Sequence, residues 1–79
     1  MRYNIYEMLI NEFYALEYGD KLRVITNSGK LLRSFTLDKY QFSLYKMNEF
    51  YVELKRETTE LSFDSIVAIN YEDLPADYK

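Results

Sequence analysis

Acidic side chains cluster in one short stretch of the sequence, which comes closest to a catalytic or metal-binding pattern. Glu57, Glu60 and Asp64 lie within eight residues, and their carboxylate oxygens are ligands that a hard cation such as Ca²⁺ would accept. No glycine-containing calcium loop accompanies them, so a solvated acidic rim is the better interpretation. We therefore predict no metal site.

The residue types that most enzymes need are missing. The sequence has no Cys and no His, which excludes disulfides, thiol nucleophiles, zinc fingers and histidine general bases. Its two glycines, Gly19 and Gly29, stand far apart, so there is no glycine-rich loop to hold a phosphate. We expect a protein that is not an enzyme, with no catalytic residues and no cofactor.

Basic residues are concentrated in the middle of the chain. Residues 21–56 hold eight of the ten Lys and Arg and three of the thirteen acidic residues, while the parts on either side are acidic. Basic and aromatic side chains in alternation are typical of single-stranded nucleic-acid binding. The candidate nucleic-acid contacts are Arg23, Lys30, Arg33, Lys39 and Tyr40. Because the net charge is −3, and because Lys and Arg also keep the outer face of a sheet in water, we rank this function second. The acidic ends could also cover the basic middle.

Tyrosine is unusually frequent, with nine in 79 residues. Exposed tyrosines offer a large contact area at a low cost in entropy and are enriched in protein interfaces. The candidate protein contacts are Tyr14, Tyr18, Tyr45 and Tyr51. A ring buried along a barrel rim with a wet hydroxyl is the structural alternative for each of them. We predict a small non-catalytic protein-interaction or regulatory accessory domain, whose partner is an unknown protein or a second copy of the chain.

A helix is expected to position the first two tyrosines. Residues 4–18 place apolar side chains at helical spacing, Asn4 and Glu7 fit a capping box, and Gly19 fits the left-handed residue that ends a helix. In this helix Tyr14 and Tyr18 share a stripe that points away from the core.

Short strands are expected to follow, because the apolar pattern changes to a period of two. We predict strands over residues 21–27, 31–37, 40–45 and 50–57 and a bent final pair over 61–69, with a hairpin turn at residues 27–30. In the clearest of them, Phe50, Val52 and Leu54 should be buried while Tyr51 and Glu53 are not. A loose tail should occupy residues 71–79.

These elements predict a single α+β domain over residues 1–79, with an N-terminal helix at about 4–18 followed by a five-stranded antiparallel small barrel at about 21–70. Closing the sheet would remove exposed edges. No long apolar run and no charged-then-apolar leader is present, so we expect a cytoplasmic protein without a membrane span.

The order of helix, Gly19, strand, Asn27-Ser28-Gly29 turn and further strands resembles the Sm-like branch of the SH3-like small barrels. The stretch from Glu60 to Ile69 is similar to the ending of bacterial YolD-like proteins, which implies a bacterial source. Met47-Asn48 resembles the Met-Asn pair of RNA-binding Sm proteins, but Leu44 stands where those proteins have an acidic residue. The final strand has no arginine, so the resemblance implies the barrel and not the Sm uridine pocket.

Overall fold

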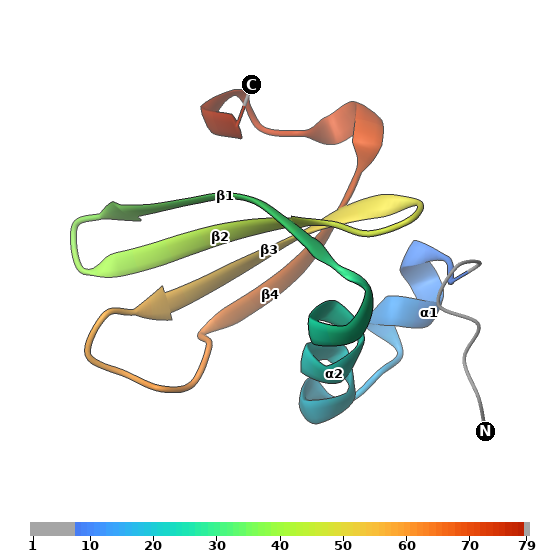
Figure 1. Ribbon diagram of the computed structural model, residues 1–79, viewed down its shortest axis with the longest axis horizontal. Helices are drawn as coiled ribbons and strands as arrows, with labels where there is room; N and C mark the ends of the chain where they lie inside the picture. The colour runs from blue at the N-terminus through green and yellow to red at the C-terminus, as the bar shows by residue number, and fades with distance from the viewer. Residues whose placement is uncertain (1–7, 79) are drawn as a thin grey trace.

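The computed structural model describes residues 8–78 as two helices, a four-stranded sheet and two C-terminal 3₁₀ turns (Figure 1). The elements follow one another along the chain in this order: α1 (Ile10–Tyr14), α2 (Tyr18–Ser28), β1 (Lys30–Leu37), β2 (Tyr40–Lys46), β3 (Phe50–Glu57), β4 (Ser65–Asn70), η1 (Tyr71–Asp73) and η2 (Ala76–Tyr78). The predicted α+β class is confirmed. The helices precede the sheet instead of alternating with its strands, which is the α+β arrangement.

The sheet is an open antiparallel meander in which each strand pairs with the next along the chain. Its order is β1-β2-β3-β4, so β1 and β4 are its two edges, and residues 8–78 do not form the predicted five-stranded barrel. Two residues, Asp38 and Lys39, join β1 to β2. Asp38 has a φ of 56°, a left-handed conformation that a short side chain such as Asp tolerates in tight turns.

Alternation along β3 divides the sheet into two faces. Phe50, Val52 and Leu54 are buried, whereas Tyr51 and Glu53 are half-buried on the other side, which confirms the register predicted for this strand. We call the side of Phe50, Val52 and Leu54 the helix face. We call the opposite side, with Tyr51, Glu53 and Lys55, the tail face.

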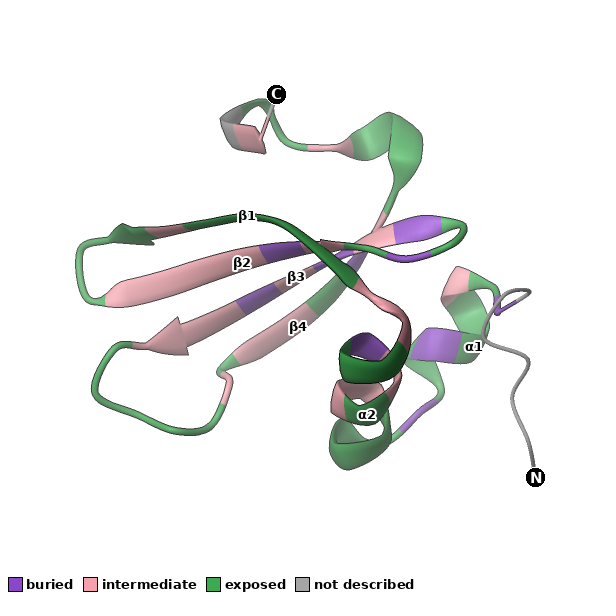
Figure 2. Cartoon of the chain, in the orientation of Figure 1, coloured by how far each residue is buried: buried purple, intermediate pink, exposed green. Residues whose placement is uncertain are grey.

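The main core lies between the two helices and the helix face. Phe13 of α1 packs on Phe50 with their ring centroids 5.5 Å apart, and both side chains are fully buried. Leu16 and Ile25 add apolar surface from the chain around and within α2. Figure 2 shows the buried positions gathered where the helices meet the strands. Apolar area removed from water at this layer is the main stabilising term of the fold.

The C-terminal segment, residues 71–78, lies on the tail face instead of forming the expected loose tail (Figure 1). The Tyr71 ring packs on Tyr51 with the centroids 4.7 Å apart, and its hydroxyl is 2.7 Å from the Met47 carbonyl oxygen. The Tyr78 hydroxyl donates to Glu53 Oε2 at 2.6 Å. The two tyrosines therefore hold the segment near its two ends.

Residues 21–27, predicted as a strand, belong to helix α2. The strand prediction was wrong because Leu22, Val24 and Thr26 alternate with period two, and because Val, Ile and Thr favour strands. The same stretch has Leu22, Ile25, Thr26 and Gly29 at spacings of three, four and seven residues, which is one face of a helix. That face turns toward the sheet and buries Ile25, so tertiary packing overrides local preference.

The helix predicted over residues 4–18 is also different in the structure. Asn4 and Glu7 lie outside the described residues, and of residues 8–17 only Ile10–Tyr14 is an α-helix before the chain turns into α2. Glu12 accepts a hydrogen bond from the Leu9 backbone N–H at 2.9 Å and so satisfies an amide at the start of α1. Gly19 lies in the first turn of α2 and has no positive φ, so it does not end a helix as predicted.

Truncating a buried side chain of β3 should cost far more stability than truncating an exposed leucine. Leu54→Ala should lower the free energy of unfolding by about 2–5 kcal/mol, because it removes contacts from the core and leaves a cavity. Leu61→Ala, at a side chain that is 95% exposed, should change it by less than about 0.5 kcal/mol. Urea denaturation of both variants measures the difference, and equal losses would contradict this core.

The two glycines should respond to alanine in opposite directions. A Cβ on Gly29 would lie 2.7 Å from the Ile25 carbonyl oxygen, so Gly29→Ala should destabilise the protein by about 1–3 kcal/mol. A Cβ on Gly19 would meet nothing within 4 Å inside a helix, so Gly19→Ala should stabilise by about 0.5–1 kcal/mol. Thermal unfolding of the two variants provides the comparison. A stabilising Gly29→Ala would show that α2 does not end against the sheet as described.

Candidate functional site: an edge strand beside a groove

Strand β1 is an edge of the sheet and is almost entirely exposed. Three of its side chains are large, apolar and open to solvent: Leu31 is 52% exposed, Leu32 45% and Leu37 58%. The register shifts between Leu31 and Arg33, so Leu32 is an extra residue without a partner on β2. From Arg33 to Leu37 the pairing with β2 is regular, and the outer side of β1 pairs with no strand among the described residues.

An apolar pocket of about 340 Å³ lies between α2 and the helix face. α2 and the glycine that follows it line one wall of the pocket, with Leu22, Ile25, Thr26 and Gly29. The sheet and the β3–β4 loop line the other wall, with Tyr45, Leu54 and Phe63. Leu31 is the cross-strand partner of Tyr45, which brings the pocket next to the edge strand. Pockets of this size and lining suit one or two apolar side chains or a small apolar ligand.

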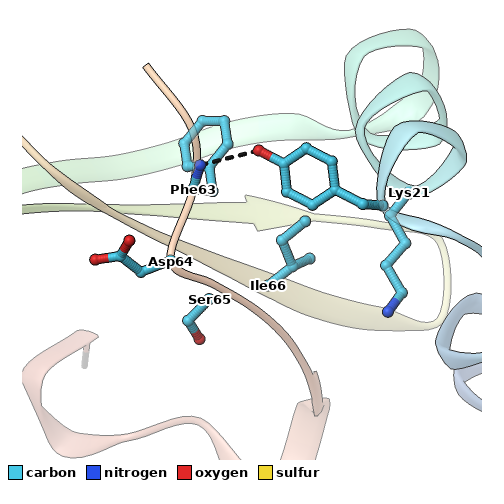
Figure 3. A pocket seen from close by; sticks show the side chains of 6 residues that line it. Lys21, Phe63, Asp64, Ser65 and Ile66 are labelled. Carbon is cyan, nitrogen blue, oxygen red and sulfur yellow. Dashed lines mark hydrogen bonds between the residues drawn. The ribbon is translucent and has the colours of Figure 1, made fainter. Parts of the chain in front are cut away.

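A smaller pocket of about 180 Å³ continues along α2 toward the loop between β3 and β4 (Figure 3). Phe63 lines both pockets, and its backbone N–H donates to the Tyr18 hydroxyl at 2.9 Å. Lys21 and Asp64 add opposite charges to its lining. The two pockets share Phe63 as a lining residue, and we call them together the groove along α2, with an apolar part near β1 and a polar part near Ser65.

The four candidate protein-contact tyrosines do not form one surface. Tyr14 and Tyr18 are exposed, as expected, but they belong to two different helices, and their hydroxyls are bonded to Ala68 O and to Phe63 N–H. Tyr45 is half-buried on the helix face, and Tyr51 is half-buried on the tail face under Tyr71. The stripe expected from one continuous helix is therefore absent in the described residues. Tyr18 and Tyr45 line two different pockets beside α2.

Most of the candidate nucleic-acid contacts come together on the tail face. Lys30 lies opposite Lys46, and Arg33 and Tyr40 point to the same side of the sheet by their register. Lys55 of β3 joins them, with its Nζ 4.2 Å from the centroid of the Tyr40 ring. Arg23 lies apart on α2, where it forms an exposed ion pair with Asp20 at 3.3 Å.

The Lys39 ammonium is held at the end of the β1–β2 turn by Glu57, at 3.0 Å. This hydrogen bond and the charge of Glu57 raise the pKa of Lys39 above its ordinary value. The pair is exposed to solvent and contributes little to stability. Its effect is to take Glu57 away from the acidic cluster that the sequence suggested, while Glu60 and Asp64 stay exposed in the following loop.

The described residues hold no group of three or more side chains that could bind a metal ion. Neither α1 nor α2 is long and apolar enough to span a membrane, as judged on the described part of the chain.

Several residues of the site were missed at the level of sequence. The exposure of the β1 leucines was not predicted, since period-two alternation shows which residues share a face but not whether the face is covered. Phe63 was assigned to a strand, although it lies in the β3–β4 loop. Lys55 is four residues from Tyr51 on β3, and only the pairing of β2 with β3 brings it to Tyr40.

Ionisation of Tyr71 should weaken the fold at high pH. Burial raises the pKa of Tyr71, and the nearby Tyr51 and Glu49 raise it further. Tyr71 therefore ionises at a lower pH in the unfolded chain than in the folded protein. Its contribution to the free energy of unfolding is complete below about pH 10 and is lost as the pH rises through the pKa of the folded state. Tyr71→Phe should lack this part of the alkaline loss, as measured by urea denaturation from pH 8 to pH 11. An identical pH dependence of the free energy of unfolding in both proteins would contradict this prediction. The difference between their free energies of unfolding at pH 8 measures the contribution of the hydroxyl's hydrogen bonds.

Comparison of the chain with models of protein families, with curated proteins and with solved structures finds no match.

Proposed function

We propose that this chain is a small non-catalytic protein-interaction domain, and that the outer edge of β1 receives an extended segment of a partner protein. The observation that carries the proposal is an eight-residue edge strand with seven exposed residues. Backbone N–H and C=O groups on an unpaired edge are a template for another strand. Peptide-binding domains that add a strand in this way gain affinity from the main chain and specificity from neighbouring side-chain pockets.

The side chains around β1 define the chemistry of the partner. Leu31, Leu32 and Leu37 offer apolar contacts, and the groove along α2 can accept an apolar side chain next to Leu31. Lys30 and Arg33 are exposed on the same strand. An extended segment that alternates apolar and acidic side chains complements this edge.

A second copy of the chain is a poorer occupant. Two antiparallel β1 strands related by a two-fold axis at Arg33 would place the Arg33 side chains of the two copies directly opposite each other. Like charges across neighbouring strands are destabilising. Self-association through β1 is therefore expected to be weaker than binding of an acidic segment.

Single-stranded nucleic-acid binding is the second candidate function. Its support is the gathering of Lys30, Arg33 and Tyr40 on the tail face. An Sm-like relationship stays a prediction and adds no support here, since the sequence lacks the uridine pocket of the Sm proteins.

Selection from a peptide library tests the proposed contact. Selected peptides should combine acidic and apolar residues, and on binding they should protect backbone amides of β1 from hydrogen exchange. The double variant Leu32→Lys/Leu37→Lys should lose this binding by about tenfold or more without losing thermal stability, because both side chains are already exposed.

Leu61→Lys is the matched control, since it makes the same change at an exposed leucine in the β3–β4 loop. Lys30, Arg33 and the irregularity at Leu32 are also features that protect a sheet edge against aggregation. If that is their only role, no peptide will be selected, or selected peptides will bind both variants equally. Either outcome contradicts the proposal. If light scattering detects a dimer and the β1 variant abolishes it, the edge of β1 serves self-association instead of binding a partner protein.

A further inference from the structure

We infer that the tail face is a binding surface for single-stranded nucleic acid, and that the C-terminal segment, residues 71–78, is an acidic strap that covers this surface until nucleic acid displaces it. The inference rests on the second candidate function and deepens it, because it adds the residues that would bind the strand and the segment that controls access to them.

The tail face carries basic side chains on three adjacent strands. Lys30 and Lys46 are directly paired across β1 and β2, Arg33 follows on β1, and Lys55 lies opposite Phe42 on β3. Of the acidic side chains on the same face, Glu57 pairs with Lys39, and Glu53 keeps its negative charge while it accepts the Tyr78 hydroxyl, so four basic groups face one unpaired carboxylate. The face therefore presents an excess of positive charge to a ligand. The negatively charged phosphates of a nucleic-acid strand complement this positive charge.

Aromatic rings lie between these basic groups. Phe35 and Phe42 stack with their centroids 5.3 Å apart, and Tyr40 lies 6.5 Å from Phe42. Arg33 lies over Phe35, and Lys55 lies over Tyr40. Rings on a sheet surface give unpaired bases a place to stack, while the cations beside them contact the backbone phosphates. This combination favours a single strand, because a duplex does not offer its base faces for stacking.

The C-terminal segment occupies part of this surface. Leu44 is only 2% exposed although its side chain points to the tail face, where the segment lies. Tyr78 packs on Phe35 at 5.6 Å, so it uses one of the rings that a base would contact. Lys46 lies 6.0 Å from the Tyr71 ring centroid. The strap and a bound strand cannot occupy these positions at the same time.

The contacts of the segment suit a cover that can open. Tyr71 and Tyr78, near its two ends, bond it to the β2–β3 turn and to the sheet, and Asp73 accepts a longer hydrogen bond of 3.5 Å from the side-chain amide of Asn70 in β4. Between the two tyrosines Glu72 and Asp73 are exposed, and they place negative charge beside the basic face. A strand of nucleic acid brings more negative charge and more stacking surface than the strap. Nucleic acid can thus replace the strap on the tail face. If the strap is open in only a fraction of the molecules, a variant that keeps it open should bind nucleic acid more tightly by the inverse of that fraction.

Fluorescence anisotropy with an unstructured oligonucleotide of about 12 nucleotides, as RNA and as DNA, tests the inference on the full chain. The unchanged protein should bind weakly at about 150 mM salt and more tightly at about 50 mM. Tyr78→Ala removes the contacts to Phe35 and Glu53, and it should tighten binding by about tenfold or more. Tyr78→Phe keeps the ring, and it should tighten binding by a smaller factor.

The basic face is tested by Lys46→Gln/Lys55→Gln in the Tyr78→Ala background. This change should weaken binding by about tenfold or more and should lower the slope of log affinity against log salt by about 1.4. Arg23→Gln is the control, because it removes one positive charge from α2 and not from the tail face. Circular dichroism before each titration confirms that the variants are folded.

Three results would overturn the inference. Absence of binding by folded Tyr78→Phe and Tyr78→Ala at 50 mM salt would exclude a nucleic-acid surface. Equal affinity with and without the Tyr78 changes would exclude the strap. If Arg23→Gln lowers the affinity for the oligonucleotide as much per removed charge as the change of the two lysines does, the attraction is non-specific and the tail face is not a site. Should Tyr78→Ala fail to fold, Tyr78→Phe and the lysine variant made in that background decide the question.

Discussion

The alternation of side chains along β3 is the constraint on which the rest of the structure depends. Phe50, Val52 and Leu54 must be removed from water on one side of the strand, and both helices serve this burial through Phe13 and Ile25. The same alternation sends Tyr51, Glu53 and Lys55 to the opposite side, where the C-terminal segment packs. A slip of one residue would exchange the two faces and expose the core.

An open sheet gives this small chain three surfaces with different chemistry. The helix face supplies the stability and, where α2 meets it, an apolar groove. The edge of β1 supplies unpaired backbone groups beside exposed leucines. The tail face supplies cations and aromatic rings under an acidic segment. A closed barrel would have used the β1 edge internally, so the proposed protein contact exists only because the sheet stays open.

The sequence pattern was sufficient where one periodicity had no competitor. Strands β1, β2 and β3 and the burial of Phe50, Val52 and Leu54 follow from alternation. It failed over residues 21–27, where Leu22 and Ile25 fit a helix face while Leu22 and Val24 fit a strand face, and only contact with the sheet decides. Once that stretch is helical, the part of the chain that the structure describes lacks the fifth strand needed for a barrel.

The candidate site was predictable only in part, for a related reason. Lys30, Arg33 and Tyr40 could be grouped because they lie on one hairpin, whose register is local. Tyr14 and Tyr18 could not be placed, since their surroundings depend on Ala68 and Phe63, some 50 positions along the chain. Whether the leucines of β1 are covered depends on the closure of the sheet, a global property that no short segment encodes.

The central claim is that α2 is a helix packed on an open sheet, and solution NMR of the full chain tests it most directly. Backbone chemical shifts of residues 18–28 should be helical, and nuclear Overhauser effects should connect Ile25 to Leu54 while none connects β1 to β4. Extended-strand shifts over residues 21–27 together with contacts that close the sheet would contradict the account. They would remove the free β1 edge and the groove at once.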